Sequence, residues 1–271
     1  MEGFGRTYCN CDAVSFTGAK CETSAASLSF NGSHGVEFVL HTLTPSASED
    51  VSLRFRTRLR NGLLFALKKF VDQPGLVLSL EDGRVKCVYD RENNNDKVIY
   101  VGDQNLFNND KWHTVHVKRT GPTVLVEVID AEKNKYFVVD DLGDNFVRVD
   151  YKYVNIGSIK SPSLEQEHAN FIGSIQNCKL NGEDLLPYYI GGKTASWGSN
   201  VFGNADPGEN SLLLHHQLTF SASCPITLPR VQANDGFDIH LFFKTSHENG
   251  VIFFRRGKEY RFMALELKGN Y

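Results

Sequence analysis

Three of the six cysteines lie close together near the start of the chain, at Cys9, Cys11 and Cys21. The surrounding segment has too few apolar residues to be held folded by burial, so a crosslink would have to hold it. Cys11 and Cys21 enclose a short loop in which Phe16 and Gly18 supply an aromatic side chain and a turn, and a disulfide could close this loop. A zinc site is the alternative, but neither a second Cys-x-x-Cys pair nor a His pair follows at a suitable distance. The pattern favours a disulfide and therefore an oxidising compartment.

Acidic side chains gather at Glu127, Asp130 and Glu132, where two carboxyl groups could hydrolyse a glycosidic bond if they faced one groove. Residues 127 and 130 fall on opposite faces of an extended strand, and the neighbouring valines mark the buried face, which leaves Glu127 to solvent. There is also no Gly-x-Ser-x-Gly turn of a serine hydrolase and no complete phosphate-binding loop. We therefore expect no catalytic activity.

Four arginines alternate with other residues at Arg54, Arg56, Arg58 and Arg60. Alternate side chains of a strand point the same way at a spacing of about 6.6 to 7 Å, so one strand would display four guanidinium groups on one face. Such a ridge suits the sulfates or carboxylates of an acidic glycan or an acidic partner. The alternative is that neighbouring strands supply Asp or Glu side chains that neutralise it.

Asn31-Gly32-Ser33 is the only Asn-x-Ser/Thr sequence in the chain and lies in a predicted turn. In an extracellular protein Asn31 could carry a glycan, although so short a motif also occurs by chance. Glycosylation at Asn31 is therefore a prediction with an unmodified asparagine as its equal alternative.

The composition is that of an ordinary globular chain: 271 residues with a formal net charge of −3, 41% hydrophobic and 23% charged residues. These values exclude disordered, collagen-like and membrane-spanning classes. No segment approaches the run of about 18 apolar residues that a bilayer requires, and the first residues do not have the pattern of a secretory leader.

From Leu28 onward, short runs with period-two alternation are separated by turn sequences such as Asn61-Gly62, Asp82-Gly83 and Asn181-Gly182. Alternation of this kind predicts strands, and no segment shows a convincing helical stripe. Many short strands without covering helices predict an all-β antiparallel sandwich or barrel.

Part of this pattern occurs twice. Thr57 and Asn61 correspond to Thr245 and Asn249, and 245 minus 57 and 249 minus 61 both give 188. Two copies of one domain explain a constant offset better than chance does. The second copy stops before most of its strands have appeared, and the residues between the copies are rich in Gly, Asn and Ser, as in a connector.

Three segments of the first copy resemble the signature of laminin G-like domains: residues 110–119, 154–157 and 171–182. The spacing of Cys9, Cys11 and Cys21 resembles the last third of an epidermal growth factor-like (EGF-like) module. An EGF-like module followed by two laminin G-like domains resembles the extracellular arrangement of neurexins and neurexin-related adhesion proteins. This resemblance implies a concanavalin A-like jelly roll of two antiparallel sheets, and it implies that Cys11 pairs with Cys21.

The resemblance divides the chain into four parts. Residues 1–22 would be the C-terminal part of the EGF-like module, 26–188 a complete laminin G-like domain, 189–210 a connector, and 211–271 the N-terminal part of a second laminin G-like domain. Cys9 would then need a partner upstream of the sequence. We expect the chain to be a piece of a longer, membrane-anchored protein.

Two positions depart from the family pattern. Ser174 stands where many members have a cysteine, and the nearest thiol is Cys178, for which Cys224 is a possible disulfide partner. Cys87 is predicted to be a buried thiol. At the rim, Pro74 stands where several members have a calcium-binding Asp; Asp72 is the nearest substitute, and the second copy has Arg261.

We therefore expect no cofactor and no metal site; His113 and His116, on opposite faces of one strand, cannot share a metal ion. The resemblance implies an extracellular fragment that binds cell-surface or matrix proteins in adhesion, at synapses if the chain is a neurexin. We expect no binding of nucleic acid. The alternative is a glycan-binding laminin G module of a matrix protein, for which the four arginines would be the binding site.

Overall fold

The computed structural model describes residues 11, 14–17, 20–33, 35–41, 47–69, 74–89, 96–102, 105–143, 150–159, 168–191, 198–203, 205–208, 241, 243, 245–256 and 261–269, with the backbone alone for 74 and 198–203. The chain divides into two compact units, Met1–Thr219 and Phe220–Tyr271. Cys9, Asp72 and Cys224 lie outside the described residues.

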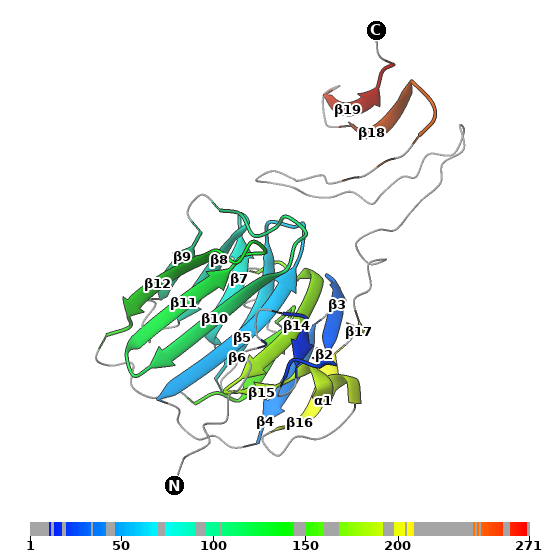
Figure 1. The fold of residues 1–271 in the computed structure, drawn as a ribbon. Coiled ribbons are helices and arrows are strands. Elements are labelled where there is room, and N and C mark those ends of the chain that lie inside the picture. Colours follow the sequence, from blue (N-terminus) through cyan, green and yellow to red (C-terminus); the bar gives the residue numbers. More distant parts are fainter. Residues whose placement is uncertain are drawn as a thin grey trace. The chain divides into compact units, whose positions relative to one another are not determined.

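The first unit is a sandwich of two antiparallel sheets (Figure 1). The first sheet contains, in spatial order, β12 (Lys135–Asp141), β11 (Thr123–Ile129), β10 (His113–Thr120), β5 (Ser48–Arg56), β14 (Ile172–Leu180), β3 (Ser27–Asn31) and β17 (Asp206–Pro207), with β15 (Glu183–Asp184) paired to β14. The second sheet contains β16 (Gly198–Gly203), β4 (Val36–Leu40), β13 (Tyr153–Ile156), β6 (Gly62–Lys68), β7 (Pro74–Glu81), β8 (Arg84–Tyr89) and β9 (Lys97–Val101). The described part of the chain has one helix, the short α1 (Leu186–Gly191).

Period-two alternation positions the core between the sheets. Val124, Val126 and Val128 of β11 are fully buried, whereas the residues between them are partly exposed. Most buried apolar residues of both sheets form one hydrophobic cluster, while a second, smaller one contains Leu63, Ala66, Val77 and Ile159. Because each sheet buries one face against the other, the predicted all-β jelly-roll class is confirmed.

Two of the predicted turns owe their shape to residues that tolerate a positive φ. Asp82 and Gly83 join β7 to β8 with φ values of 51° and 82°, and Asn181 and Gly182 join β14 to β15 with 50° and 85°. Asn, Asp and Gly at paired positions of positive φ favour the tight hairpins that match strand twist.

An ion pair crosses the buried face of the first sheet. Arg119 of β10 lies opposite Glu49 of β5, both side chains are almost fully buried, and Arg119 Nη2 donates to Glu49 Oε1 at 2.6 Å. A second hydrogen bond from Arg119 Nε makes the pair bidentate. A buried pair of this kind fixes the register of the two strands more than it adds to stability.

The N-terminal segment is a small crosslinked hairpin. Cys11 and Cys21 form a disulfide with a Cα–Cα distance of 5.6 Å, which confirms this pairing and excludes zinc at these two thiols. The short strands β1 (Phe16–Thr17) and β2 (Thr23–Ser24) pair beside it. The hairpin rests on β14, where Asn177 Nδ2 donates to the carbonyl oxygen of Val14 at 2.9 Å.

The possible disulfide between Cys178 and Cys224 does not agree with the structure at Cys178. Cys178 is a free thiol with no exposed surface, and it belongs to the hydrophobic core. The reason is a register shift in β14 between Gln176 and Lys179, with Asn177 at φ 51°, which turns Cys178 toward the core after Ile175. Cys87 is likewise a free, buried thiol, as predicted, and burial raises the pKa of both groups.

The second unit contains one described hairpin, β18 (Gly250–Arg256) and β19 (Phe262–Leu267). Its apolar side chains are largely exposed, with Phe254 and Phe262 stacked at 5.7 Å between ring centroids. Residues 211–240 lie outside the described residues, so the proposed start of the second copy at 211 stays a prediction.

Candidate functional site

The end of the sandwich where β5 stops and β10 begins gathers the side chains with the most binding chemistry. β5 ends at Arg56, and Trp112 directly precedes β10, so that the arginines and the tryptophan meet on the outer face of the first sheet. We call Arg54, Arg56, Arg58 and Trp112 the arginine–tryptophan surface.

Arg54 is not displayed to solvent as the four-residue ridge required. It is 7% exposed, because the N-terminal hairpin covers it and its Nη1 donates to Ser15 Oγ at 2.9 Å and to Gln176 Oε1 at 2.7 Å. The predicted ridge is wrong at this position. Alternation correctly places Arg54 on the outer face, but a segment 39 residues earlier in the chain covers that face.

The ridge is also interrupted beyond Arg56. The strand ends there, so Arg58 and Arg60 follow the loop that leads to β6. Arg58 forms a salt bridge with Asp110 at 2.7 Å, while Arg60 is exposed. The neutralisation considered as the alternative thus occurs at Arg58, through a loop residue rather than a neighbouring strand.

Trp112 also belongs to this candidate site, although the alternating sequence pattern did not indicate it. The guanidinium carbons of Arg54 and Arg56 lie 5.1 and 5.3 Å from its ring centroid, within cation–π range. The ring is partly exposed. Trp and Arg are the side chains most often found at the energetic centre of protein interfaces.

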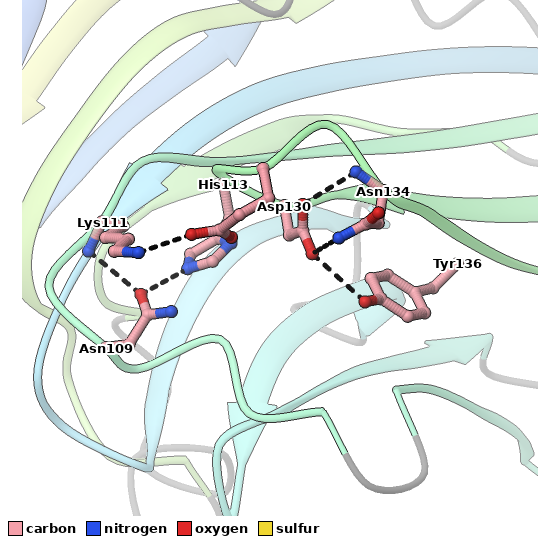
Figure 2. A network of polar contacts seen from close by, with 7 residues as sticks. Asn109, Lys111, His113, Asp130, Asn134 and Tyr136 are labelled. Carbon is pink, nitrogen blue, oxygen red and sulfur yellow. Dashed lines mark hydrogen bonds and ion pairs between the residues drawn. The ribbon is translucent and has the colours of Figure 1, made fainter.

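Next to this surface, a polar network ties the loop before β10 to the turn between β11 and β12 (Figure 2). His113 Nε2 is 2.8 Å from Asn109 Oδ1, and its ring packs against Phe55 and Phe107 with centroid distances of 5.7 and 5.3 Å. Because the ring is buried, desolvation lowers the pKa of His113 to about 4. His113 is therefore neutral at physiological pH.

The turn side of the network centres on Asp130. Its carboxylate accepts hydrogen bonds from Asn134 N and Asn134 Nδ2, each at 2.8 Å, and from Tyr136 Oη at 3.1 Å. Lys111 Nζ bonds Glu132 Oε1 at 2.5 Å and links the turn to the loop before β10. Figure 2 shows Asn109 and Lys111 on one side of His113, and Asp130, Asn134 and Tyr136 on the other.

These carboxylates do not have the properties of a glycosidase pair. Desolvation raises the pKa of Asp130, but the hydrogen bonds from Asn134 and Tyr136 outweigh it and hold the pKa below its ordinary value. The hydrogen bond from Lys111 lowers the pKa of Glu132. A general acid needs a raised pKa, and the pKa values of both carboxyl groups are lowered instead. The hydrogen bonds of Asp130 stabilise the turn between β11 and β12. Glu127 lies on the outer face, 3.2 Å from Lys135 Nζ.

No cluster of three or more metal-ligating side chains occurs among the residues that the structure describes. His113 is buried while His116 is partly exposed on the opposite face, as predicted. Pro74, at the position of the family's calcium-binding Asp, begins β7 opposite Lys68. The part of the rim that the structure describes thus offers no side-chain oxygen at that position.

Asn31 lies at the exposed end of β3. Its Oδ1 accepts from Ser33 N at 3.0 Å and from Ser33 Oγ at 2.6 Å, so the asparagine and the hydroxyl of the predicted acceptor sequence meet at the surface. Glycosylation at Asn31 stays a prediction.

Comparison with known families identifies the sandwich. Residues 55–183 match the family model described as Laminin G domain. The sandwich has the laminin G jelly-roll fold. The matched range begins in β5 and ends at β15, and so includes Arg56, Arg58, Trp112 and the polar network but not Arg54 or the N-terminal hairpin.

The sandwich and its flanking segments together are similar to neurexins. The chain is 30% identical to Neurexin-3a of Danio rerio over all of its length, 26% identical to Neurexin 1 of Drosophila melanogaster over 98%, and 26% identical to Neurexin-2 of Mus musculus over all of it. It spans only 15 to 16% of the length of these relatives.

Solved structures agree on the fold. The LG1-3 region of the laminin alpha2 chain superposes with a TM-score of 0.56 at 15% identity, covering 69% of this chain and 35% of that one. A heptameric SAP-like pentraxin from Limulus polyphemus gives 0.50 at 13% identity, covering 70% of this chain and 97% of that one. At these identities the likeness concerns the laminin G sandwich alone.

Proposed function

We propose that this chain is an extracellular, non-catalytic adhesion fragment whose laminin G domain binds proteins on cell surfaces or in the matrix. The observation that carries the proposal is the similarity to three neurexins, which extends from the crosslinked hairpin through the sandwich to the second unit. The Cys11–Cys21 disulfide supports an oxidising, extracellular location.

The parent protein would be anchored in the plasma membrane outside this segment. None of the helices in the described residues is long and apolar enough to span a membrane.

The binding surface would be the exposed part of the arginine–tryptophan surface. Trp112 and Arg56 are partly exposed there, and the polar network holds the loop that carries Trp112 against the β11–β12 turn. A rigid aromatic side chain loses little conformational entropy on binding, which favours it as the centre of an interface.

Saturable binding to intact animal cells tests this proposal. Labelled full-length chain should bind at physiological salt, compete with unlabelled chain, and remain bound when calcium is chelated, because Pro74 replaces the family's ligand. The variant Trp112→Ala should weaken binding about tenfold or more, whereas Leu106→Ala, at an exposed apolar side chain of a neighbouring loop, should not. Absence of saturable binding by the native chain would overturn the proposal.

A second candidate function is binding of an acidic glycan. It is favoured by Arg56, which is partly exposed, and by Arg60, which is exposed, near the end of β5. Because the four arginines do not form one exposed ridge, we expect the chain to be retained on heparin only weakly and in a salt-sensitive way.

Charge reversal tests this second candidate. The double variant Arg56→Glu/Arg60→Glu should elute from heparin at distinctly lower salt than the native chain. The control Lys118→Glu/Lys133→Glu has the same change in net charge at exposed positions of the same sheet and its turn. Equal shifts for both variants would show only a response to net charge and would reject a site at these arginines.

A further inference from the structure

The outer strand of the first sheet has an open edge and an exposed apolar face. β12 pairs with β11 on one side, and no described strand pairs with its other side (Figure 1). On its outer face Phe137 is 64% exposed and Val139 59% exposed. Natural edge strands are usually short, charged, bulged or covered, because an unpaired edge is a template for another strand.

The hydrogen-bonding groups that point to the open edge belong to the same residues. Asp130 N donates to Asn134 O at 3.0 Å, and Leu142 N donates to Pro122 O at 2.8 Å, at the two ends of the β11–β12 ladder. Antiparallel ladders alternate, so the even-numbered residues of β12 bond to β11 and the odd-numbered residues point their N–H and C=O groups away. These odd-numbered residues are Lys135, Phe137, Val139 and Asp141. At the C-terminal end of the strand, Asp141 N donates to Asp140 Oδ1 at 2.8 Å and Asp141 Oδ1 accepts from Gly143 N at 2.6 Å, so pairing there would exchange these local bonds.

The order of these four residues is self-complementary. An antiparallel pairing of two copies of β12, centred on Val138, places Lys135 opposite Asp141 and Phe137 opposite Val139, each pair occurring twice. Opposite charges and aromatic–β-branched pairs are the cross-strand combinations that stabilise antiparallel sheets. Registers centred on Phe137 or Val139 lose the two Lys–Asp pairs.

The partly exposed neighbours extend the apolar contact. Leu125 of β11 lies opposite Val139 and adds apolar surface beside it. Glu127 lies opposite Phe137 and forms a salt bridge of 3.2 Å with Lys135 within the same chain. The strand therefore offers charge at both ends and apolar surface at its centre, the arrangement expected of an isologous interface with two-fold symmetry.

We propose that two copies of this chain associate through antiparallel pairing of their β12 strands, which joins the two first sheets into one continuous sheet. The arginine–tryptophan surface lies at the end of β5 and the start of β10, and β10 and β11 separate β5 from β12, so both copies keep it accessible. Such a dimer presents two binding surfaces to the same cell and raises the avidity of a weak site without new contacts.

Sedimentation equilibrium of the full-length chain over a concentration series tests the proposal. The native chain should approach twice its mass of 30.4 kDa. Val139→Pro removes an N–H that points to the open edge without removing a β11 hydrogen bond, and should give a monomer with an unchanged circular dichroism spectrum.

Charge exchange tests the register. Lys135→Asp alone creates two like-charge pairs and should weaken dimerisation about tenfold, Asp141→Lys should do the same, and the double variant should restore it. The matched control is Phe262→Lys, which changes an exposed aromatic residue of the second unit and should leave the dimer intact. A monomeric native chain, or a dimer lost only in Phe262→Lys, would overturn the proposal, as would a double variant no better than either single one.

Discussion

At the scale of single residues, His113 shows how a polar side chain is used inside the sandwich. One ring nitrogen is bonded to Asn109, while the ring fills space between Phe55 and Phe107. Histidine suits this position because the neutral ring is both flat enough to pack with aromatic side chains and polar enough to fix the loop that carries Trp112.

This burial predicts a pH dependence of stability. An unfolded histidine has a pKa of about 6.5, whereas that of His113 in the folded chain is about 4, so between these values the unfolded chain binds a proton that the folded chain does not. The stabilisation by neutral His113 is therefore complete above pH 6.5 and is lost as the pH falls toward 4. The loss is on the order of 3 kcal/mol.

Chemical denaturation of the native chain and of His113→Gln at several pH values measures this effect. The variant should be less stable than the native chain at pH 7, and the difference should shrink steadily toward pH 4. A difference that stays constant with pH would contradict a buried, neutral His113. Desolvation raises the pKa of Asp184 to about 6, so this group changes the stability in the opposite direction. Because Asp184 is present in both proteins, its effect cancels in the difference between their free energies of unfolding.

At the scale of elements, the N-terminal hairpin and β14 behave as one structure. The irregularity in β14 places Asn177 at φ 51° with its amide toward the hairpin, where Nδ2 donates to Val14 O at 2.9 Å and lies 3.4 Å from Phe16 O. Ser15 accepts from Arg54 of β5 in the same region. The hairpin is thus attached to the outer face of the sheet by polar contacts and by its covalent connection to β3.

The variant Asn177→Gly tests this attachment, because glycine accepts the positive φ but lacks the amide. Loss of hydrogen bonds worth about 1 kcal/mol each should increase hydrogen exchange about tenfold at residues 14–17. Asn181→Gly is the matched control, since it also replaces an asparagine of positive φ, at 50°, in the β14–β15 turn. Unchanged exchange in Asn177→Gly, or equal changes in both variants, would contradict the role of Asn177.

The elements themselves could be predicted from sequence because alternation and turn chemistry are local. The valines of β11 and the turns at Asp82-Gly83 and Asn181-Gly182 have the predicted structure. The resemblance to laminin G-like domains supplied what periodicity could not, namely a jelly roll and the pairing of Cys11 with Cys21.

The candidate site could be predicted only in part, because it depends on contacts between distant segments. Alternation placed Arg54 on the outer face but could not show that Ser15 and the hairpin cover it. It could not show the irregularity at Asn177 that turns Cys178 inward, nor the loop contact between Arg58 and Asp110. It also cannot distinguish an exposed apolar face, as at Phe137 and Val139, from a buried one.

At the scale of the whole molecule, the sandwich with the laminin G fold is preceded in the sequence by a crosslinked hairpin and followed by a second compact unit. The crosslinked hairpin belongs to the first compact unit, while the second unit contributes a hairpin with exposed aromatic residues. Similarity to neurexins covers all of these parts. The proposed function follows from this similarity together with the partly exposed Arg56 and Trp112 on the sandwich.

The class of the partner is the central question, and enzymatic treatment of cells decides it. Labelled full-length chain is added at physiological salt to untreated cells, to cells treated with a protease, and to cells treated with heparin lyases. We predict that protease treatment abolishes saturable binding and that heparin lyases leave it nearly unchanged. Binding that survives the protease and disappears after heparin lyase treatment would contradict a protein-binding laminin G domain.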